Sequence, residues 1–349
     1  MFKTTNKRKF VKPKAIDISQ REIVREGQLQ TGEMLPLLIQ PNVSDVDLKT
    51  WYLENKDRIE ENVLKYGGVL FRGFNIKTSD DFYDFINSIC TQPLSYKEGA
   101  TPRSAVKGKV YTSTEFPPEE HIALHNELSY VLTWPKKIWF SSIIGAKEGG
   151  ETPIADVRKV YQFLEPSIRE KFEEKGWMLV RNYGDGFGQP WQYVFHTESQ
   201  EEVEKYCKEN GMECEWKENG MLRTRQVRPA VTVHPDTEEK LWFNHIAFWH
   251  KSSLKQSVRE MLLKEFGEEG LPYNTYYGDG TPIEDEVVAA LRQAYDKATV
   301  AFPWVEGDVL VLDNMLVAHG RNPYKGERKT LVAMGEPTTR NEMKKEDNE

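Results

Sequence analysis

Residues 125–127 read His-Asn-Glu, and residues 313–321 read Asp-Asn-Met-Leu-Val-Ala-His-Gly-Arg. These two stretches decide how the chain is interpreted, because together they supply two histidines and one carboxylate: His125, Glu127 and His319. Such a ligand set occupies one face of an octahedral Fe(II) and leaves the remaining positions open for a bidentate co-substrate and for O2. The sequence therefore predicts a non-haem iron centre.

The conformation of the first stretch decides which side chains act together. Residues 122–132 read Ile-Ala-Leu-His-Asn-Glu-Leu-Ser-Tyr-Val-Leu, and we expect an extended segment in which positions 125 and 127 point the same way. The alternative is a helix, on which His121 and His125 would share one face as in a zinc helix. The extended conformation favours the pairing of His125 with Glu127.

Two further motifs accompany the ligands. Residues 149–156 read Gly-Gly-Glu-Thr-Pro-Ile-Ala-Asp, and residues 319–328 read His-Gly-Arg-Asn-Pro-Tyr-Lys-Gly-Glu-Arg. With them, the chain resembles the Fe(II)/2-oxoglutarate-dependent dioxygenases of the taurine dioxygenase and clavaminate synthase-like superfamily, whose pattern is His-x-Asp/Glu, Gly-Gly-Asp/Glu-Thr, and a distal His followed by Arg. The resemblance covers most of the chain. It extends to the syringomycin-type stand-alone hydroxylases of nonribosomal peptide pathways.

The resemblance implies roles for individual residues. Thr152 and Arg328 are expected to bind the far carboxylate of 2-oxoglutarate, with Arg321 as a rival that we expect instead to brace the loop through a salt bridge. His125, Glu127 and His319 are expected to hold Fe(II), with O2 as the second co-substrate. Because halogenating relatives lack the carboxylate ligand, Glu127 favours hydroxylation of an unactivated C–H bond. Desaturation or cyclisation on the same scaffold stays open.

Candidate substrate-binding residues lie between the two ligand stretches. His121, Arg225, Asn244 and His245 are polar groups that could reach the pocket. For His245 a packing or hydrogen-bonded role is the stronger alternative. For Arg225 the alternative is a solvent-facing position on a strand. Asp313 is expected to cap the turn that presents the distal histidine.

Composition limits the class of protein. The chain has 349 residues, 38% of them hydrophobic, which is enough for a sizeable core. The net charge of -8 and the pI near 5.6 argue against a nucleic-acid partner. The three cysteines show no disulfide or zinc spacing. Because the sequence contains no signal peptide and no apolar run of about 18 residues, we expect a cytoplasmic protein without membrane contact.

Strands dispersed along the chain, with the ligands at strand ends, predict a mainly β fold with flanking helices, the double-stranded β-helix or jelly roll. We expect one jelly-roll dioxygenase domain over residues 21–337, preceded by a basic irregular N-terminus and followed by a polar tail. The outer segments are residues 1–20 and 338–349, and an insertion on the surface is expected at about residues 195–220.

Local patterns predict the elements within this domain. A Pro-, Ser- and Gly-rich loop over 95–120 is expected to cover the pocket, and residues 223–244 are expected to form a hairpin with its turn at 235–237. Helices are expected at 45–66, from Ser79, at 157–175 with a break at Pro166, at 199–210, at 253–266 and at 284–299.

Three functions remain compatible with the sequence. The first, which the resemblance favours, is hydroxylation of an amino acid, free or tethered as an aminoacyl group to a peptidyl carrier protein, in specialised metabolism such as antibiotic biosynthesis. The second is a catabolic dioxygenase acting on a sulfonate such as taurine. The third is a jelly-roll binding protein that has lost turnover, and the complete ligand set counts against it. The oxidised carbon and the oligomeric state stay open.

Overall fold

The computed structural model describes residues 23–94, 105–108, 110–113, 116–184 and 188–340. The expected basic N-terminus and most of the polar tail lie outside these residues, as does much of the expected loop at 95–120. The parts of that loop that the structure describes include two short strands, β4 (Ala105–Lys107) and β5 (Val110–Thr112).

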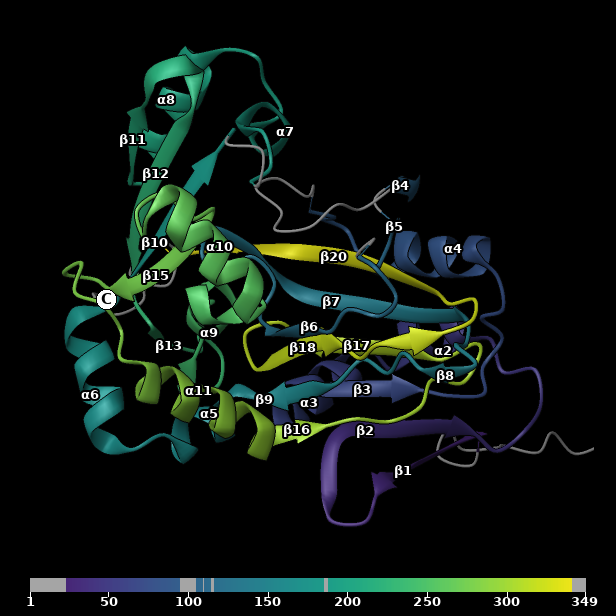
Figure 1. Ribbon diagram of the computed structural model, residues 1–349. Coiled ribbons are helices and arrows are strands. Elements are labelled where there is room, and N and C mark those ends of the chain that lie inside the picture. Colours follow the sequence, from purple (N-terminus) through teal and green to yellow (C-terminus); the bar gives the residue numbers. More distant parts are fainter. Residues whose placement is uncertain (1–22, 95–104, 109, 114–115, 185–187, 341–349) are drawn as a thin grey trace, which may run out of the picture.

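Two sheets build the core of the molecule (Figure 1). The larger sheet contains β4 and β5 together with six further strands, and its order is β1-β2-β3-β17-β7-β20-β5-β4. The six strands are β1 (Val24–Gln30), β2 (Glu33–Pro41), β3 (Gly68–Phe71), β17 (Val309–Asp313), β7 (Thr133–Ile144) and β20 (Lys329–Thr339). The smaller sheet has the order β16-β9-β18-β6, with β16 (Thr299–Val300), β9 (Ile154–Asp156), β18 (Val317–Arg321) and β6 (Ile122–His125). This arrangement confirms the predicted jelly roll.

The N-terminal helices pack on the larger sheet with a hydrophobic cluster of their own, which includes Trp51, Phe71 and Phe82. The helix expected over 45–66 is two helices, α2 (Leu48–Glu54) and α3 (Lys56–Tyr66). Asn55 separates them, and its side-chain amide donates to the backbone carbonyl of Trp51 at 2.8 Å. The next helix, α4 (Ser79–Ile89), begins at the predicted residue, and Thr78 is its N-cap.

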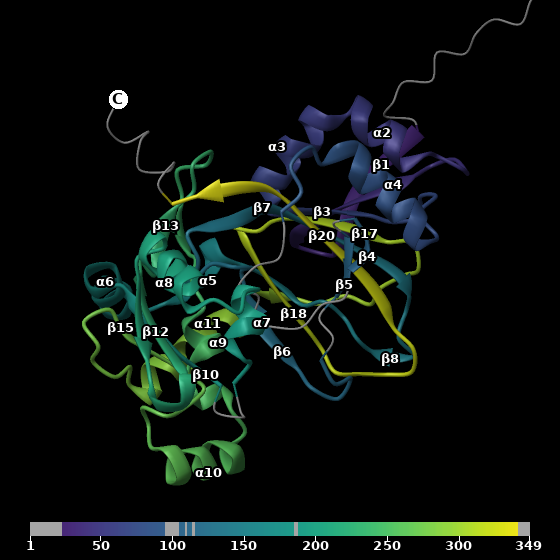
Figure 2. The ribbon, with the colours of Figure 1, turned by 90° about the horizontal axis from the view of Figure 1, so that it is seen from above.

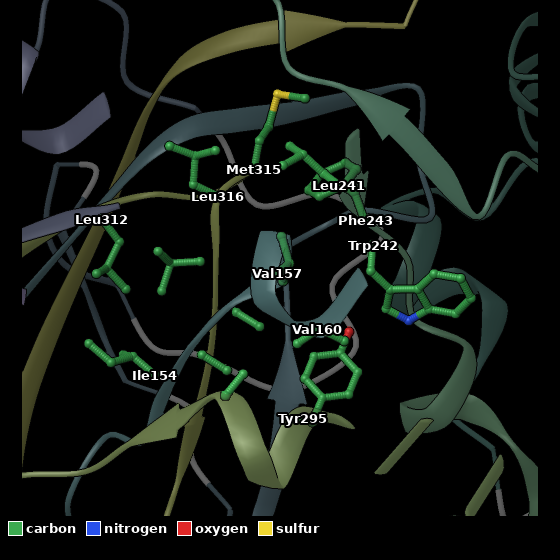
Figure 3. Packing of buried hydrophobic residues seen from close by; sticks show 14 of the residues in the cluster. Ile154, Val157, Val160, Leu241, Trp242, Phe243, Tyr295, Leu312, Met315 and Leu316 are labelled. Carbon is green, nitrogen blue, oxygen red and sulfur yellow. The ribbon is translucent and has the colours of Figure 1, made fainter. Parts of the chain in front are cut away.

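Helices from the middle and the C-terminal part of the chain cover the smaller sheet. The predicted break at Pro166 is confirmed, because α5 (Val157–Phe163) ends before α6 (Pro166–Lys175) begins. Helix α11 (Asp285–Ala298) packs on α5 and β9. Figure 3 shows the buried side chains between these elements and the jelly roll, among them Ile154, Val157 and Trp242.

A second four-stranded sheet stands beside the jelly roll (Figure 2). Its order is β11-β12-β10-β15, from β11 (Met212–Trp216), β12 (Leu222–Arg228), β10 (Trp177–Tyr183) and β15 (Tyr273–Tyr277). Helices α7 (Trp191–Phe195) and α8 (Gln200–Glu209) lie beside it, and α8 matches the predicted helix. Residues 195–220 thus include an edge strand of this sheet, and they share a small separate core with it.

The hairpin prediction was partly wrong. Only β13 (Val231–Val233) and β14 (Lys240–Trp242) form the hairpin, whereas residues 222–228 belong to β12. Pro229 follows β12 and cannot donate a backbone hydrogen bond, so the strand ends there. The remaining elements are β8 (Glu148–Gly149), β19 (Tyr324–Lys325), α9 (Ile246–Trp249), α10 (Gln256–Phe266) and the short 3-10 turns η1 (Glu218–Gly220) and η2 (Lys251–Ser253). Among the described residues, no helix is long and apolar enough to cross a membrane.

Candidate active site

Neighbouring strands of the smaller sheet carry the two predicted histidine ligands. His125 is the last residue of β6, and His319 lies opposite it in the register of β18. Strand β6 ends before Glu127, so the extended segment predicted through position 127 was too long. A tight turn follows, in which Leu128 has a left-handed φ of 56°. The turn brings the carboxylate back to the histidines.

The three side chains converge on one point. The Oε2 atom of Glu127 lies 3.9 Å from Nε2 of His125 and 3.8 Å from Nε2 of His319. The three ligand atoms all lie within 4.8 Å of one another, and all three residues are buried. The Nδ1 atom of His125 is 2.9 Å from the carbonyl oxygen of Ala123. Because a carbonyl only accepts, Nδ1 carries the proton and Nε2 presents its lone pair, so the arrangement fits a divalent iron ion.

Asn314 connects the turn that bears Glu127 to the strand that bears His319. Its Oδ1 accepts from the backbone N–H of Glu127 at 2.7 Å, and its Nδ2 donates to the carbonyl of Glu127 at 2.9 Å. The side-chain amide of Asn126 in turn donates to the backbone carbonyl of Asn314 at 2.7 Å. Sequence reasoning missed this residue. Its only signal was a position five residues before the distal histidine.

Asp313 caps the turn that leads to the distal histidine, as predicted. Its Oδ1 accepts from the backbone N–H of Met315 at 2.8 Å and of Leu316 at 3.0 Å. The buried His234 ring donates from Nε2 to the other carboxylate oxygen at 3.3 Å. Both turns of the site are therefore held by buried polar side chains.

A pocket beside the triad contains the residues predicted for the co-substrate. Its walls include the two histidines together with Thr152, Arg321 and Arg328, and the apolar side chains of Ile122, Phe140 and Val332. The structure thus brings together the predicted iron ligands and the predicted carboxylate-binding residues.

Arg328 offers this pocket a positive charge. Its Nε donates to the carbonyl of Gly150 at 2.9 Å, and one terminal nitrogen donates to Oγ of Ser113 at 3.2 Å. Burial, followed by the charge of Arg321, lowers the pKa of Arg328 to about 10. Within the described residues no carboxylate lies within salt-bridge distance of its guanidinium. Thr152, whose Oγ1 accepts from the indole N–H of Trp304 at 3.0 Å, lines the same pocket.

Arg321 has a bracing role in the described residues, through hydrogen bonds to backbone carbonyls, and the salt bridge expected for it stays a prediction. Its guanidinium donates to the backbone carbonyls of Phe116 at 2.9 Å, Pro117 at 2.6 Å and Glu120 at 2.9 Å. Burial lowers the pKa of Arg321. These contacts hold the segment that leads into β6, so its donors are largely used by the protein itself.

The four candidate substrate residues lie in different places. The His245 ring is 5.4 Å from that of His125, and its Nδ1 is 2.6 Å from Oγ of Ser129. Burial lowers the pKa of His245 well below the usual value. Asn244 instead supports the backbone, because its amide donates to the carbonyl of Ala230 at 2.9 Å.

His121 and Arg225 are separated from the triad. His121 is exposed and lines a groove that lies between β6, α9 and α11. Arg225 lies on β12 of the second sheet, where its guanidinium is 3.0 Å from Glu215 and 3.8 Å from Glu213. The structure therefore brings only His245 next to the predicted iron ligands.

Known proteins resemble this chain over most of its length. A dapdiamide synthesis protein, DdaC, of Enterobacter agglomerans is 39% identical over 86% of this chain and 91% of its own. A clavaminate synthase-like protein of Arabidopsis thaliana is 32% identical over 77% of this chain and 81% of its own. Among solved structures, PvcB of Pseudomonas aeruginosa superposes with a TM-score of 0.51 at 16% identity over 85% of this chain and 84% of its own.

A taurine dioxygenase structure from Burkholderia xenovorans gives the same TM-score of 0.51 at 15% identity, covering 91% of this chain and 92% of its own. These two likenesses show a shared fold. The profile of the family described as "Taurine catabolism dioxygenase TauD, TfdA family" matches residues 31–334. Enzymes of this class use Fe(II) as cofactor and 2-oxoglutarate and O2 as co-substrates, and the His-Glu-His cluster described above fits the metal. The chain therefore belongs to the TauD/TfdA family of Fe(II)/2-oxoglutarate-dependent dioxygenases.

Proposed function

We propose that this enzyme hydroxylates an unactivated C–H bond of an amino acid, free or carried as an aminoacyl group on a peptidyl carrier protein, in the biosynthesis of a specialised metabolite. The similarity to a dapdiamide synthesis protein, at 39% identity over 86% of the chain, supports the biosynthetic setting. An antibiotic-type product is consistent with that relative. Amino acids would then be the substrate class on which this chain performs the chemistry of its family.

The residues of the site would have separate roles in binding the metal and the co-substrate. His125, Glu127 and His319 would hold Fe(II), which with 2-oxoglutarate and O2 supplies an oxidant strong enough to attack an unactivated C–H bond. Arg328 would bind the far carboxylate of 2-oxoglutarate in a charge-assisted hydrogen bond, aided by the Thr152 hydroxyl. The apolar walls of the pocket would exclude water from the reacting centre.

The observation that carries the proposal is the complete triad with Glu127 in place. Its carboxylate lies within 4 Å of both histidine Nε2 atoms, at 3.9 and 3.8 Å. A third protein ligand fills the position that a halide needs in halogenating enzymes of this type. The geometry therefore supports oxygen transfer to carbon rather than halogen transfer.

A mass-spectrometric screen tests the proposal. The iron-loaded enzyme is incubated with 2-oxoglutarate, O2 and either free amino acids or carrier-loaded aminoacyl groups, with taurine in parallel. We expect a gain of one oxygen in an amino-acid substrate, matched by an equal amount of succinate, and neither product from His319→Ala. Turnover of taurine alone would replace the proposal with sulfonate catabolism. A loss of two hydrogens would indicate desaturation or cyclisation.

A further inference from the structure

A second groove has strand β6 in its wall and shares none of its lining residues with the co-substrate pocket. It has a volume of about 570 Å³, within the size range of small-molecule sites. Strand β6, helices α9 and α11 and the turn η2 form its walls. Its floor is apolar, with Ala123, Leu124 and Phe248, and its far wall is polar, with Ser252, Arg292 and Asp296.

Phe248 connects this groove to the metal position. Its ring lines the groove and lies 5.0 Å from the ring of His125 and 5.3 Å from that of His245, measured between centroids. Leu124, the neighbour of the first ligand in β6, lines the same space. A molecule in the groove is therefore separated from the iron ligands by one aromatic side chain.

Arg292 is a half-buried cation on the groove wall. One terminal nitrogen donates to Oγ of Ser252 at 2.8 Å, and within the described residues no carboxylate lies within salt-bridge distance of the guanidinium. Burial, followed by the charge of Arg259, lowers the pKa of Arg292. A guanidinium carries five N–H donors in a planar fork. Most of its donors are therefore available to a ligand in the groove.

Asp296 places the opposite charge one helical turn further along α11. It is exposed and lines the same groove. Residues four apart on a helix lie side by side, roughly 6 Å between Cβ atoms. A cation and an anion side by side match the carboxylate and the ammonium group that an α-amino acid carries on one carbon.

We propose that this groove binds the substrate, with Arg292 holding an oxyanion of the substrate and Asp296 its ammonium group, so that the carbon chain runs along Leu124 and Phe248 towards the metal. The inference rests on the proposed function and names the recognition chemistry of that reaction. The oxyanion is the α-carboxylate of a free amino acid, because only there do an anion and an ammonium group lie on the same carbon. A carrier-borne substrate would instead bring the phosphate of its pantetheine arm to Arg292 and leave Asp296 without an ammonium partner.

Calorimetric titration distinguishes the two sources without turnover. The full chain, loaded anaerobically with Fe(II) and 2-oxoglutarate, is titrated with the free proteinogenic amino acids and, separately, with 4′-phosphopantetheine. We expect a free amino acid to bind and Arg292→Gln to weaken that binding about 30-fold or more, because a charged hydrogen bond in a partly buried site is lost. Arg292→Lys keeps the positive charge but removes the planar set of guanidinium donors, so its affinity for the ligand should fall by a smaller factor.

Lys297→Gln is the matched control, because it removes a positive charge from the same helix at an exposed position outside the groove. The affinity of the Lys297→Gln variant for the bound probe should stay within about twofold of that of the unmodified protein, since exposed charges contribute little. Absence of amino-acid binding, binding of 4′-phosphopantetheine alone, or unchanged amino-acid affinity in Arg292→Gln would overturn the inference. Binding that depends on Arg292 but without oxygen transfer would leave the inference standing and reject the proposed hydroxylation.

Discussion

Arg328 in the inner pocket of the jelly roll and two arginines of the second sheet, Arg223 and Arg225, have opposite kinds of partner. In the pocket, Arg328 donates to neutral oxygens, namely the backbone carbonyl of Gly150 and the hydroxyl of Ser113. On the second sheet, Arg223 is 3.1 Å from the carboxylate of Glu269, and Arg225 is 3.0 Å from that of Glu215. Neutral acceptors orient a guanidinium without cancelling its charge, whereas carboxylates cancel it.

A guanidinium that lines a pocket without a carboxylate partner keeps its charge for a ligand, whereas one paired with a carboxylate does not. Arg292 in the groove resembles Arg328 in this respect, since its described hydrogen bond goes to the hydroxyl of Ser252. A charge held partly out of water without a carboxylate is costly for folding alone. We therefore expect substitution of Arg328 to affect ligand binding and substitution of Arg225 to affect stability slightly.

The largest effect is expected at the triad itself. Only two protein ligands remain for the labile Fe(II) ion in each of the variants His125→Ala, Glu127→Ala and His319→Ala. We therefore expect each variant to lose iron binding and turnover. Anaerobic Fe(II) titration of each variant measures the loss, and a circular dichroism spectrum controls for folding. If any of the three retained full iron occupancy and activity, that residue would not be a ligand.

The next effect compares the two arginines of the pocket. Arg328→Ala should raise the 2-oxoglutarate KM about 30-fold or more, because the charge-assisted bond to a desolvated carboxylate contributes about 2–5 kcal/mol. Arg321→Ala should raise it far less, since its donors already hold the carbonyls of Phe116, Pro117 and Glu120. Steady-state kinetics at varied 2-oxoglutarate decides between them, and a larger KM increase in the Arg321 variant would reverse the assignment.

Thr152→Val refines the same comparison. The hydroxyl lines the pocket and already accepts from Trp304 at 3.0 Å, so its removal takes away one hydrogen bond to the carboxylate but no positive charge. A hydrogen bond from a neutral donor to a charged acceptor contributes about 1.5 kcal/mol, so we expect a roughly tenfold increase in the 2-oxoglutarate KM. An increase as large as that of Arg328→Ala would mean that charge is not what the pocket contributes.

Motif spacing made the pocket predictable. The ligands and the co-substrate residues lie in short stretches, and the register of strands β6, β9 and β18 then brings those stretches together. The sequence did not predict the split of the first helix at Asn55 or the end of β12 at Pro229. Hydrophobic periodicity is judged over many residues, so it does not show that a single residue ends a helix or a strand.

Long-range side-chain contacts could not be predicted. Asn314 reaches a turn that is 187 residues away in the chain, and only the fold shows that its amide faces the backbone of Glu127. Arg225 looked similar to a ligand-binding arginine because nothing local revealed the facing strand β11, which supplies Glu213 and Glu215. In both cases the deciding partner lies on another element.

The smallest effect is expected for Arg225→Ala, which tests the other side of the comparison. Its side chain and that of Glu215 are 32% and 46% exposed, so water screens their interaction and its loss should lower the unfolding free energy by only about 0.5 kcal/mol. The KM values for 2-oxoglutarate and for the amino-acid substrate should stay within about twofold, because its charge is cancelled by the carboxylates of β11. Urea unfolding and steady-state kinetics measure the two quantities. A substrate KM raised tenfold or more with unchanged stability would show that Arg225 leaves its carboxylates to bind substrate, and arginines on the second sheet would then also serve ligands.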